Sequence, residues 1–336
     1  MDPLVQTIAL LLGAAVVIYL ACEFFVNGVE WVGHRFDVGQ KATGTILAAF
    51  GTALPESVVT FVAVAFGVSP AQKAIGIGAA LGGPLVLATI AYAVVGWSLF
   101  LTKRQLPTGQ AARADFGQLS RDQTWFAVIF VVKLALGLVL FAFKPWVGIA
   151  FLAAYAVYFW KEMQGGGQDD ADEGEREPLK FAPKAETPAT ALAVTQTVVA
   201  LVVIFLASRL FVSQIDTLGP MLGIQPQLLA LLVSPIATEL PETLNAIIWI
   251  RQGKVRLALA NISGAMMIQA TVPTAFGLFF TPWMLSPPLV LGGVITLAAI
   301  ILLLVAFRSG QVSRTLLSAM AVGYAVFAGL LAILRL

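Results

Sequence analysis

Two short segments join a proline to a glutamate in the middle of otherwise apolar stretches. Residues 51–56 read G-T-A-L-P-E, and residues 237–242 read A-T-E-L-P-E, 186 positions later. A proline inside a helix removes a backbone hydrogen bond, and a charged residue at the middle of a bilayer costs about 2.5 kcal/mol or more. An unfavourable feature that occurs twice indicates a site assembled from two related halves of the chain.

The chemistry of the two segments is that of oxygen ligands. Pro55 and Pro241 are each expected to break a helix near the bilayer centre, which would free backbone carbonyls around positions 50–52 and 236–238. The side chains that would face the same cavity are the following: Thr52, Glu56, Thr238 and Glu242. Oxygen-only ligands suit hard cations such as Ca²⁺, Na⁺, Mg²⁺ or Mn²⁺. We therefore expect a cation site rather than two structural kinks.

The composition is that of an integral membrane protein. The chain has 336 residues, of which 59% are hydrophobic and 11% charged, whereas soluble domains carry about 25% charged residues. The single Cys22 excludes a disulfide framework, and the single His34 excludes a multi-histidine metal site. We expect no bound cofactor, no nucleic acid partner and no direct use of ATP, since no nucleotide-binding motif is present. The expected partners are the lipid bilayer and inorganic cations.

Ten stretches are long and apolar enough to be read as membrane-spanning helices. They lie near residues 5–33, 41–67, 71–101, 124–141, 145–161, 190–217, 225–251, 255–281, 285–306 and 313–334. The strongly polar segment 162–188, with an acidic run, is predicted to be a solvated linker. The chain would therefore consist of residues 1–161 and 189–336, with five spans each.

The distribution of Lys and Arg sets the orientation, because cytoplasmic loops are rich in these residues. If both termini lie outside, fifteen basic residues fall in the inner loops, and three, Lys73, Lys144 and Arg335, fall outside. The linker is then cytoplasmic, and the cell membrane is the expected location. The sequence leaves the oligomeric state open, and a monomer is compatible with it.

The repeat extends beyond the two short segments. At a constant offset of 186, matching residues continue without a gap from about 21 to 83. Because each half has five spans, an odd number, the second half must be inserted upside down relative to the first. We therefore predict an all-α polytopic protein of ten transmembrane helices in two inverted five-helix repeats, an architecture typical of transporters.

The two segments resemble the α-repeats of the cation/calcium exchanger superfamily, which includes the sodium/calcium exchangers. Those repeats typically read G-T-S-L-P-E, followed by a helix with G-N-x-x-G-S-N-x-x-N or -D. The resemblance covers residues of about 13–98 and 199–280. It implies antiport by alternating access, with ions bound between helices 2, 3, 7 and 8 while helices 1 and 6 slide across that core. It also implies Ca²⁺ as the cargo and Na⁺ as the counter-ion.

Several ligand positions depart from the family pattern. Thr52, Glu56, Thr238 and Glu242 match it, but side-chain oxygens of sodium sites are missing at Ala53, Ala79, Gly83 and Ala265, and Gln269 replaces an acid or amide. Glu239 replaces a serine and would add a third carboxylate. Like charges at close range favour protonation of one of them. An alternative is therefore an H⁺-coupled exchanger of Ca²⁺, Mn²⁺ or Mg²⁺.

Functions of other classes fit less well. A cation channel would need a continuous polar pore instead of enclosed ligands. An intramembrane enzyme would need a nucleophile pair or a metal motif, and neither is present, so we expect no enzymatic activity. Glu23 and Arg209 hold equivalent repeat positions and would form an ion pair only if their depths agree. Lys133, in the middle of the fourth span, is expected to lie outside the ion site.

Overall fold

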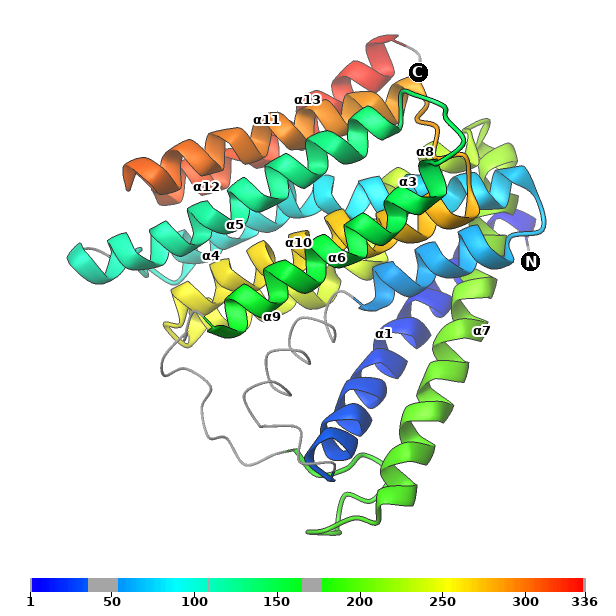
Figure 1. The fold of residues 1–336 in the computed structure, drawn as a ribbon, viewed down its shortest axis with the longest axis horizontal. Helices are drawn as coiled ribbons and strands as arrows, with labels where there is room; N and C mark the ends of the chain where they lie inside the picture. Colours follow the sequence, from blue (N-terminus) through cyan, green and yellow to red (C-terminus); the bar gives the residue numbers. More distant parts are fainter. Residues whose placement is uncertain (1, 36–53, 108, 165–176, 335–336) are drawn as a thin grey trace.

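The computed structural model describes residues 2–35, 54–107, 109–164 and 177–334, and all regular elements within them are helices (Figure 1). This confirms the predicted all-α class. The first half contains α1 (Pro3–Arg35), helix Leu54–Phe66, α3 (Pro70–Val86), the π-helical turn η1 (Leu87–Ala91), α4 (Tyr92–Leu101), α5 (Gly109–Leu136) and α6 (Lys144–Gln164). The second half contains α7 (Thr190–Leu222), α8 (Pro226–Thr238), α9 (Leu240–Arg251), α10 (Val255–Phe280), α11 (Pro287–Ser309), α12 (Arg314–Ala319) and α13 (Ala321–Leu334).

Six of the described helical segments are long and apolar enough to cross a membrane. They are Pro3–Gly33, Pro70–Leu101, Thr190–Leu222, Val255–Phe280, Pro287–Ser309 and Arg314–Leu334. Shorter apolar helices, Leu54–Phe66 and Pro226–Ile236, fall within the predicted second and seventh spans. The protein is therefore a polytopic helical membrane protein.

The fourth predicted span, 124–141, is wrong at both ends. Helix α5 begins at Gly109 and ends at Leu136, because its charged first half is stabilised by neighbours and not by lipid. Asp115 forms an ion pair of 3.2 Å with Arg256. The Tyr158 hydroxyl donates a hydrogen bond of 3.2 Å to the carboxylate of Asp122. A search for apolar stretches misses a helix that carries such paired charges.

The repeat-equivalent helices α1 and α7 pack along one another in opposite directions (Figure 1). Near the end of α1, the Asn27 side chain accepts a hydrogen bond of 2.9 Å from Gln196, which lies near the start of α7. Gly28 allows this approach, because a Cβ there would overlap the hydroxyl of Thr197 at 2.5 Å. The two helices are thus neighbours, as the family resemblance implied, and their opposite directions agree with inverted halves.

The equivalent helices α3 and α10 also run in opposite directions. The α3–η1–α4 rod ends at Leu101, and the nearby Arg104 guanidinium lies 3.5 Å from the carbonyl of Arg251. Arg251 closes α9, directly before α10 begins at Val255. The end of the first rod and the start of the second therefore lie together, which is the inversion expected from the repeat.

Close packing of α3 on α8 depends on two glycines. A Cβ at Gly78 would overlap the backbone carbonyl of Gln227, and one at Gly82 would overlap the carbonyl of Leu231. The Leu231 carbonyl has no helical donor four residues later, because that residue is Pro235. Small residues at this contact bring the two helices close enough to enclose the polar groups between them.

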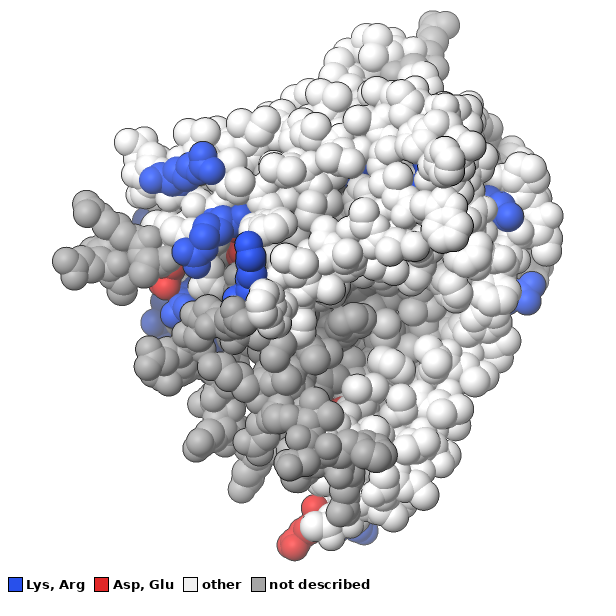
Figure 2. Space-filling model, in the orientation of Figure 1, with Lys and Arg blue, Asp and Glu red and all other residues white. Residues whose placement is uncertain are grey.

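Basic residues gather at one end of the bundle (Figure 2). There the Arg314 guanidinium lies 3.5 Å from the carbonyl of Arg104, which itself reaches Arg251, and Arg308 donates to Thr124 at 3.1 Å. All of these residues belong to segments that the charge distribution places on one side of the membrane. The structure thus brings described parts of three predicted inner loops together.

The described end of the linker is packed, in contrast to the predicted solvated segment. Leu179 is fully buried between Trp31 and Ala193, and the Trp31 indole donates to the carbonyl of Glu177 at 3.1 Å. Lys180 forms an ion pair of 3.1 Å with Glu23. Glu23 therefore pairs with the linker, and among the described residues no ion pair joins it to Arg209.

Candidate cation site

The second P-E segment forms a one-residue break between two helices. Helix α8 ends at Thr238, Glu239 has non-helical dihedral angles of φ −96° and ψ 1°, and α9 begins at Leu240 with Pro241 in its first turn. The predicted break is thus confirmed, but residues 236–238 still belong to the last turn of α8. Because the last carbonyls of a helix lack intrahelical donors, this junction still exposes backbone oxygens.

The first P-E segment is described from Leu54 onward. The chain is helical from there to Phe66, and Pro55 lies in the first described turn. Glu56 follows in the first turn and is 1% exposed. Thr52 and Ala53, together with the carbonyls of residues 50–52, lie outside the described residues.

Carboxylates from the two halves meet at one hydroxyl. The Thr238 Oγ1 atom lies 2.7 Å from Oε2 of Glu56 and 3.2 Å from Oε1 of Glu239. All three side chains are buried, with exposed fractions of 1–2%. A hydroxyl has a single hydrogen, so it can donate to only one of the two carboxylates at a time. The two halves therefore share a compact group of oxygens in a dehydrated environment.

Gln269 and Gly83 complete this group on the α10 and α3 sides. The Gln269 amide donates to Oε2 of Glu239 at 2.7 Å. A Cβ at Gly83 would lie 2.6 Å from Oε1 of Gln269 and 3.1 Å from Oε1 of Glu239. The absence of a side chain at position 83 thus makes room for the side chains of Glu239 and Gln269. The small residue at 83 and the larger ones at 239 and 269, which all depart from the family pattern, therefore fit together.

Glu242 is fully buried in the first turn of α9. Among the described residues, no three carboxylate, thiol or imidazole groups lie together as metal ligands would. The set of three carboxylates is therefore not closed in this conformation, in which Glu56 and Glu239 lie beside Thr238.

The expected loss of hydroxyls around this group is plain in the structure. Ala79 and Ala265, at the positions where the family carries serines, are 0% and 2% exposed and belong to the inner faces of α3 and α10. Neither offers a side-chain oxygen. The polar groups of the site are consequently concentrated at the α8–α9 junction, Glu56 and Gln269.

Lys133 lies beside the site, contrary to the prediction that it lies outside. Its ammonium is fully buried and donates to the carbonyls of Ala80 at 2.7 Å and Gln269 at 3.3 Å. These carbonyls are four residues before Pro84 and Pro273, which have no N–H to bond them. The sequence shows the two prolines that free these carbonyls, but not that the helix carrying Lys133 packs against them.

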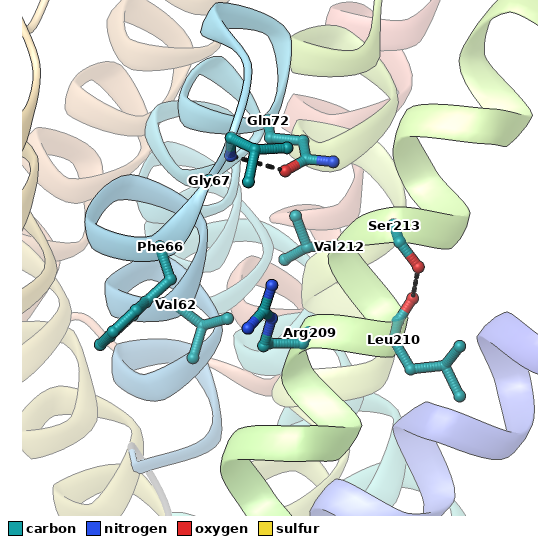
Figure 3. A pocket seen from close by; sticks show the side chains of 9 residues that line it. Val62, Phe66, Gly67, Gln72, Arg209, Leu210, Val212 and Ser213 are labelled. Atoms are coloured by element: carbon teal, nitrogen blue, oxygen red, sulfur yellow. Dashed lines mark hydrogen bonds between the residues drawn. The ribbon is translucent and has the colours of Figure 1, made fainter.

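A separate pocket of about 310 Å³ opens between helix Leu54–Phe66 and α7. Figure 3 shows Arg209 extending from α7 toward Val62 and Phe66, with Gln72 at the upper rim. The carboxylates of the site are not part of its lining. Arg209 thus belongs to this pocket and not to the cation site.

The family comparison covers both halves of the chain. The model of the sodium/calcium exchanger protein family matches residues 6–161 and 192–332. CaxA of Alkalimonas amylolytica, described as a candidate antiporter, is 25% identical over 319 residues, with 93% of this chain and 92% of that one covered. The inner membrane protein YrbG of Escherichia coli strain K12 is 26% identical over 297 residues, with 84% and 82% covered.

Solved exchanger structures have the same fold. The H⁺/Ca²⁺ exchanger CAX superposes with a TM-score of 0.68 at 16% identity, covering 98% of this chain and 88% of that chain. The sodium-calcium exchanger NCX_Mj superposes with a TM-score of 0.59 at 16% identity, covering 97% and 99%. Because the family model matches most of the sequence in both repeats, this chain belongs to the sodium/calcium exchanger protein family.

Proposed function

We propose that this protein is a secondary antiporter that moves a divalent cation by alternating access, with Ca²⁺ as the first cation to test. The observation that carries the proposal is the contact of Glu56 from one half with Thr238 and Glu239 from the other. Buried carboxylates and hydroxyls at such a junction match the preference of hard cations for oxygen ligands. Relative motion of the two halves would open and close a site built in this way.

The proposed ligands are the side chains predicted from the sequence: Thr52, Glu56, Thr238, Glu239, Glu242 and Gln269. Glu56, Glu239 and Gln269 lie in or beside the observed oxygen group. Glu242 is buried one turn away on α9. A divalent cation between the carboxylates would contact the Thr238 hydroxyl, which now lies between Glu56 and Glu239, and would draw Glu242 inward.

The membrane arrangement is part of the proposal. It has ten spans in two inverted five-helix repeats, 1–161 and 189–336, with both termini outside the cell membrane and the linker 162–188 in the cytoplasm. The grouping of Arg104, Arg251 and Arg314 at one end of the bundle supports it, since basic loops stay in the cytoplasm. Single cysteines at Lys73 and Lys184 in a Cys22→Ser background should react with a membrane-impermeant reagent from opposite sides.

The geometry favours H⁺ over Na⁺ as the counter-ion. Thr238 has one hydrogen for two carboxylates, and Glu56 accepts it at the shorter distance of 2.7 Å. The 3.2 Å contact between Thr238 and Glu239 is then satisfied when the Glu239 carboxyl is protonated and donates to the hydroxyl. The side-chain oxygens that would hold Na⁺ are absent at Ala79, Gly83 and Ala265. Sodium/calcium exchange, implied by the family resemblance, is the second candidate.

Vesicles with the purified protein and an internal Ca²⁺ indicator distinguish these cases. We expect uptake to follow an imposed pH gradient, acid inside, and to be unchanged by a Na⁺ gradient at equal ionic strength. Glu56→Gln should abolish uptake, whereas Glu186→Gln, at an exposed linker position, should leave it intact. Uptake driven by the Na⁺ gradient alone would exclude H⁺ coupling, and single-channel currents would exclude an antiporter.

A further inference from the structure

The environment of Lys133 is that of a cation-binding site. The ammonium lies on the carbonyl oxygens of Ala80 and Gln269, 2.7 Å and 3.3 Å away. The rings of Phe130 and Trp283 flank it, with centroids at 5.4 Å and 5.8 Å from Nζ. Carbonyl oxygens and aromatic faces both attract cations, and the attraction is strongest where water is excluded.

The two carbonyls are available because of the sequence of the helices that carry them. In α3, Ala80 lies four residues before Pro84, and in α10, Gln269 lies four residues before Pro273. Each proline lacks the N–H that would donate to the carbonyl four residues earlier, so each helix has one buried carbonyl without a helical donor. Lys133 from α5 satisfies both carbonyls at once and thereby links a core helix of each half.

The position of this ammonium relative to the carboxylates gives it a second effect. Gln269 offers its backbone carbonyl to Lys133 and its side-chain amide to Glu239. The lysine therefore supports the backbone of Gln269 and brings a positive charge to a residue that contacts Glu239.

We propose that Lys133 is a tethered cation that occupies, in place of a free monovalent ion, a site formed by the carbonyls of Ala80 and Gln269. This inference rests on the proposed function, because it concerns the ion requirement of the same transport site. Three carboxylates and one fixed ammonium leave the site with two negative charges, which a single divalent cation neutralises. Lys133 is thus a positioning residue that makes divalent-cation binding independent of any second, monovalent cation.

The test is the dependence of Ca²⁺ binding on monovalent cations. ⁴⁵Ca²⁺ binding to the purified full-length protein is measured in choline, K⁺, ammonium or methylammonium chloride at one ionic strength. Binding to the wild-type protein should vary by less than about twofold among these salts. In Lys133→Ala, which opens the carbonyl site to solution ions, K⁺ or methylammonium should raise Ca²⁺ affinity by about tenfold relative to choline, a difference of about 1.4 kcal/mol.

Two further variants control for structural effects. Lys133→Met fills the same space without charge, so no monovalent cation should change its Ca²⁺ affinity. Lys144 is a matched lysine that also binds backbone carbonyls, Val139 at 2.6 Å and Trp283 at 3.0 Å, away from the carboxylates. Lys144→Ala should behave like the wild-type protein in all four salts.

The outcomes separate this inference from the proposed function. If the wild-type protein binds no divalent cation, the proposed function itself is wrong. If the wild-type protein binds Ca²⁺ but its affinity rises with K⁺ or ammonium, or if Lys133→Ala binds Ca²⁺ equally in all salts, Lys133 is not a tethered cation. If the alanine variant does not fold, the wild-type measurement still tests the inference, because a rise of affinity with K⁺ or ammonium would overturn it.

Discussion

The Thr238 hydroxyl donates a hydrogen bond of 2.7 Å to the Glu56 carboxylate, across 182 positions of the sequence. The two residues come from different halves of the chain, and each lies in a P-E segment. This bond therefore joins the two repeats at the place where their symmetry brings them together.

Removal of the Thr238 hydroxyl tests whether it matters for transport. Thr238→Val keeps the shape of the side chain but leaves Glu56 without its donor. A hydrogen bond to a charged group contributes roughly 1.5–3 kcal/mol, so Ca²⁺ affinity should change by at least about tenfold. The measurement is the Ca²⁺ concentration at half-maximal uptake. Thr217→Val, at an exposed position of α7, is the control, and equal values for both variants would contradict the prediction.

Neutralisation of Glu239 tests its role in coupling. Glu239→Gln keeps the contacts with Thr238 and Gln269 but cannot release a proton. Uptake of Ca²⁺ driven by a pH gradient should be lost, because the coupling proton has no carrier. The vesicle assay with imposed gradients measures this directly, with Glu186→Gln as the control. Undiminished pH-driven uptake in the Glu239→Gln protein would show that the proton is carried elsewhere.

A side chain at position 83 should displace the Gln269 and Glu239 side chains from the positions that they have in the structure. In Gly83→Ala the added Cβ would approach Gln269 Oε1 to 2.6 Å, so that Gln269 and Glu239 must move. We expect transport to fall at least about tenfold, given that overpacking costs about 1–3 kcal/mol. Gly329→Ala on α13, where no atom lies within 4 Å of the added Cβ, should be neutral.

A double-mutant cycle refines this prediction. Gln269→Ala removes the atom that the new Cβ would meet, so Gly83→Ala should cost less in that background than in the wild-type protein. Uptake rates of the four proteins in the cycle give the coupling between the two positions. Strictly additive effects would mean that the side chains at 83 and 269 do not compete for space.

The charges around the site predict electroneutral exchange. Three carboxylates and the Lys133 ammonium leave two negative charges, which one divalent cation or two protons would balance. Ca²⁺ uptake in vesicles should therefore be insensitive to a membrane potential set with K⁺ and valinomycin. A rate that changes several-fold with the potential would mean that a net charge moves in each cycle.

Much of the architecture is determined by the sequence alone. The long apolar stretches predicted the helical membrane class. In lipid, a segment of this kind must satisfy its own backbone polar groups, and a helix does so. The ungapped repeat at an offset of 186 predicted the inversion, and the opposite directions of α1 and α7 and of α3 and α10 agree with it. The break between α8 and α9 followed from Pro241, since proline cannot donate to the helical ladder.

Only the tertiary structure decided which polar groups meet. The start of α5 was missed because its charges are paired with Arg256 and Tyr158, partners far away in the sequence. Lys133 was placed outside the site, because nothing local shows that α5 packs against the carbonyls freed by Pro84 and Pro273. A sequence records the periodicity and the chemistry of each helix. Contacts between helices depend on packing and on compensating gaps such as the one at Gly83, and these exist only once the helices are assembled.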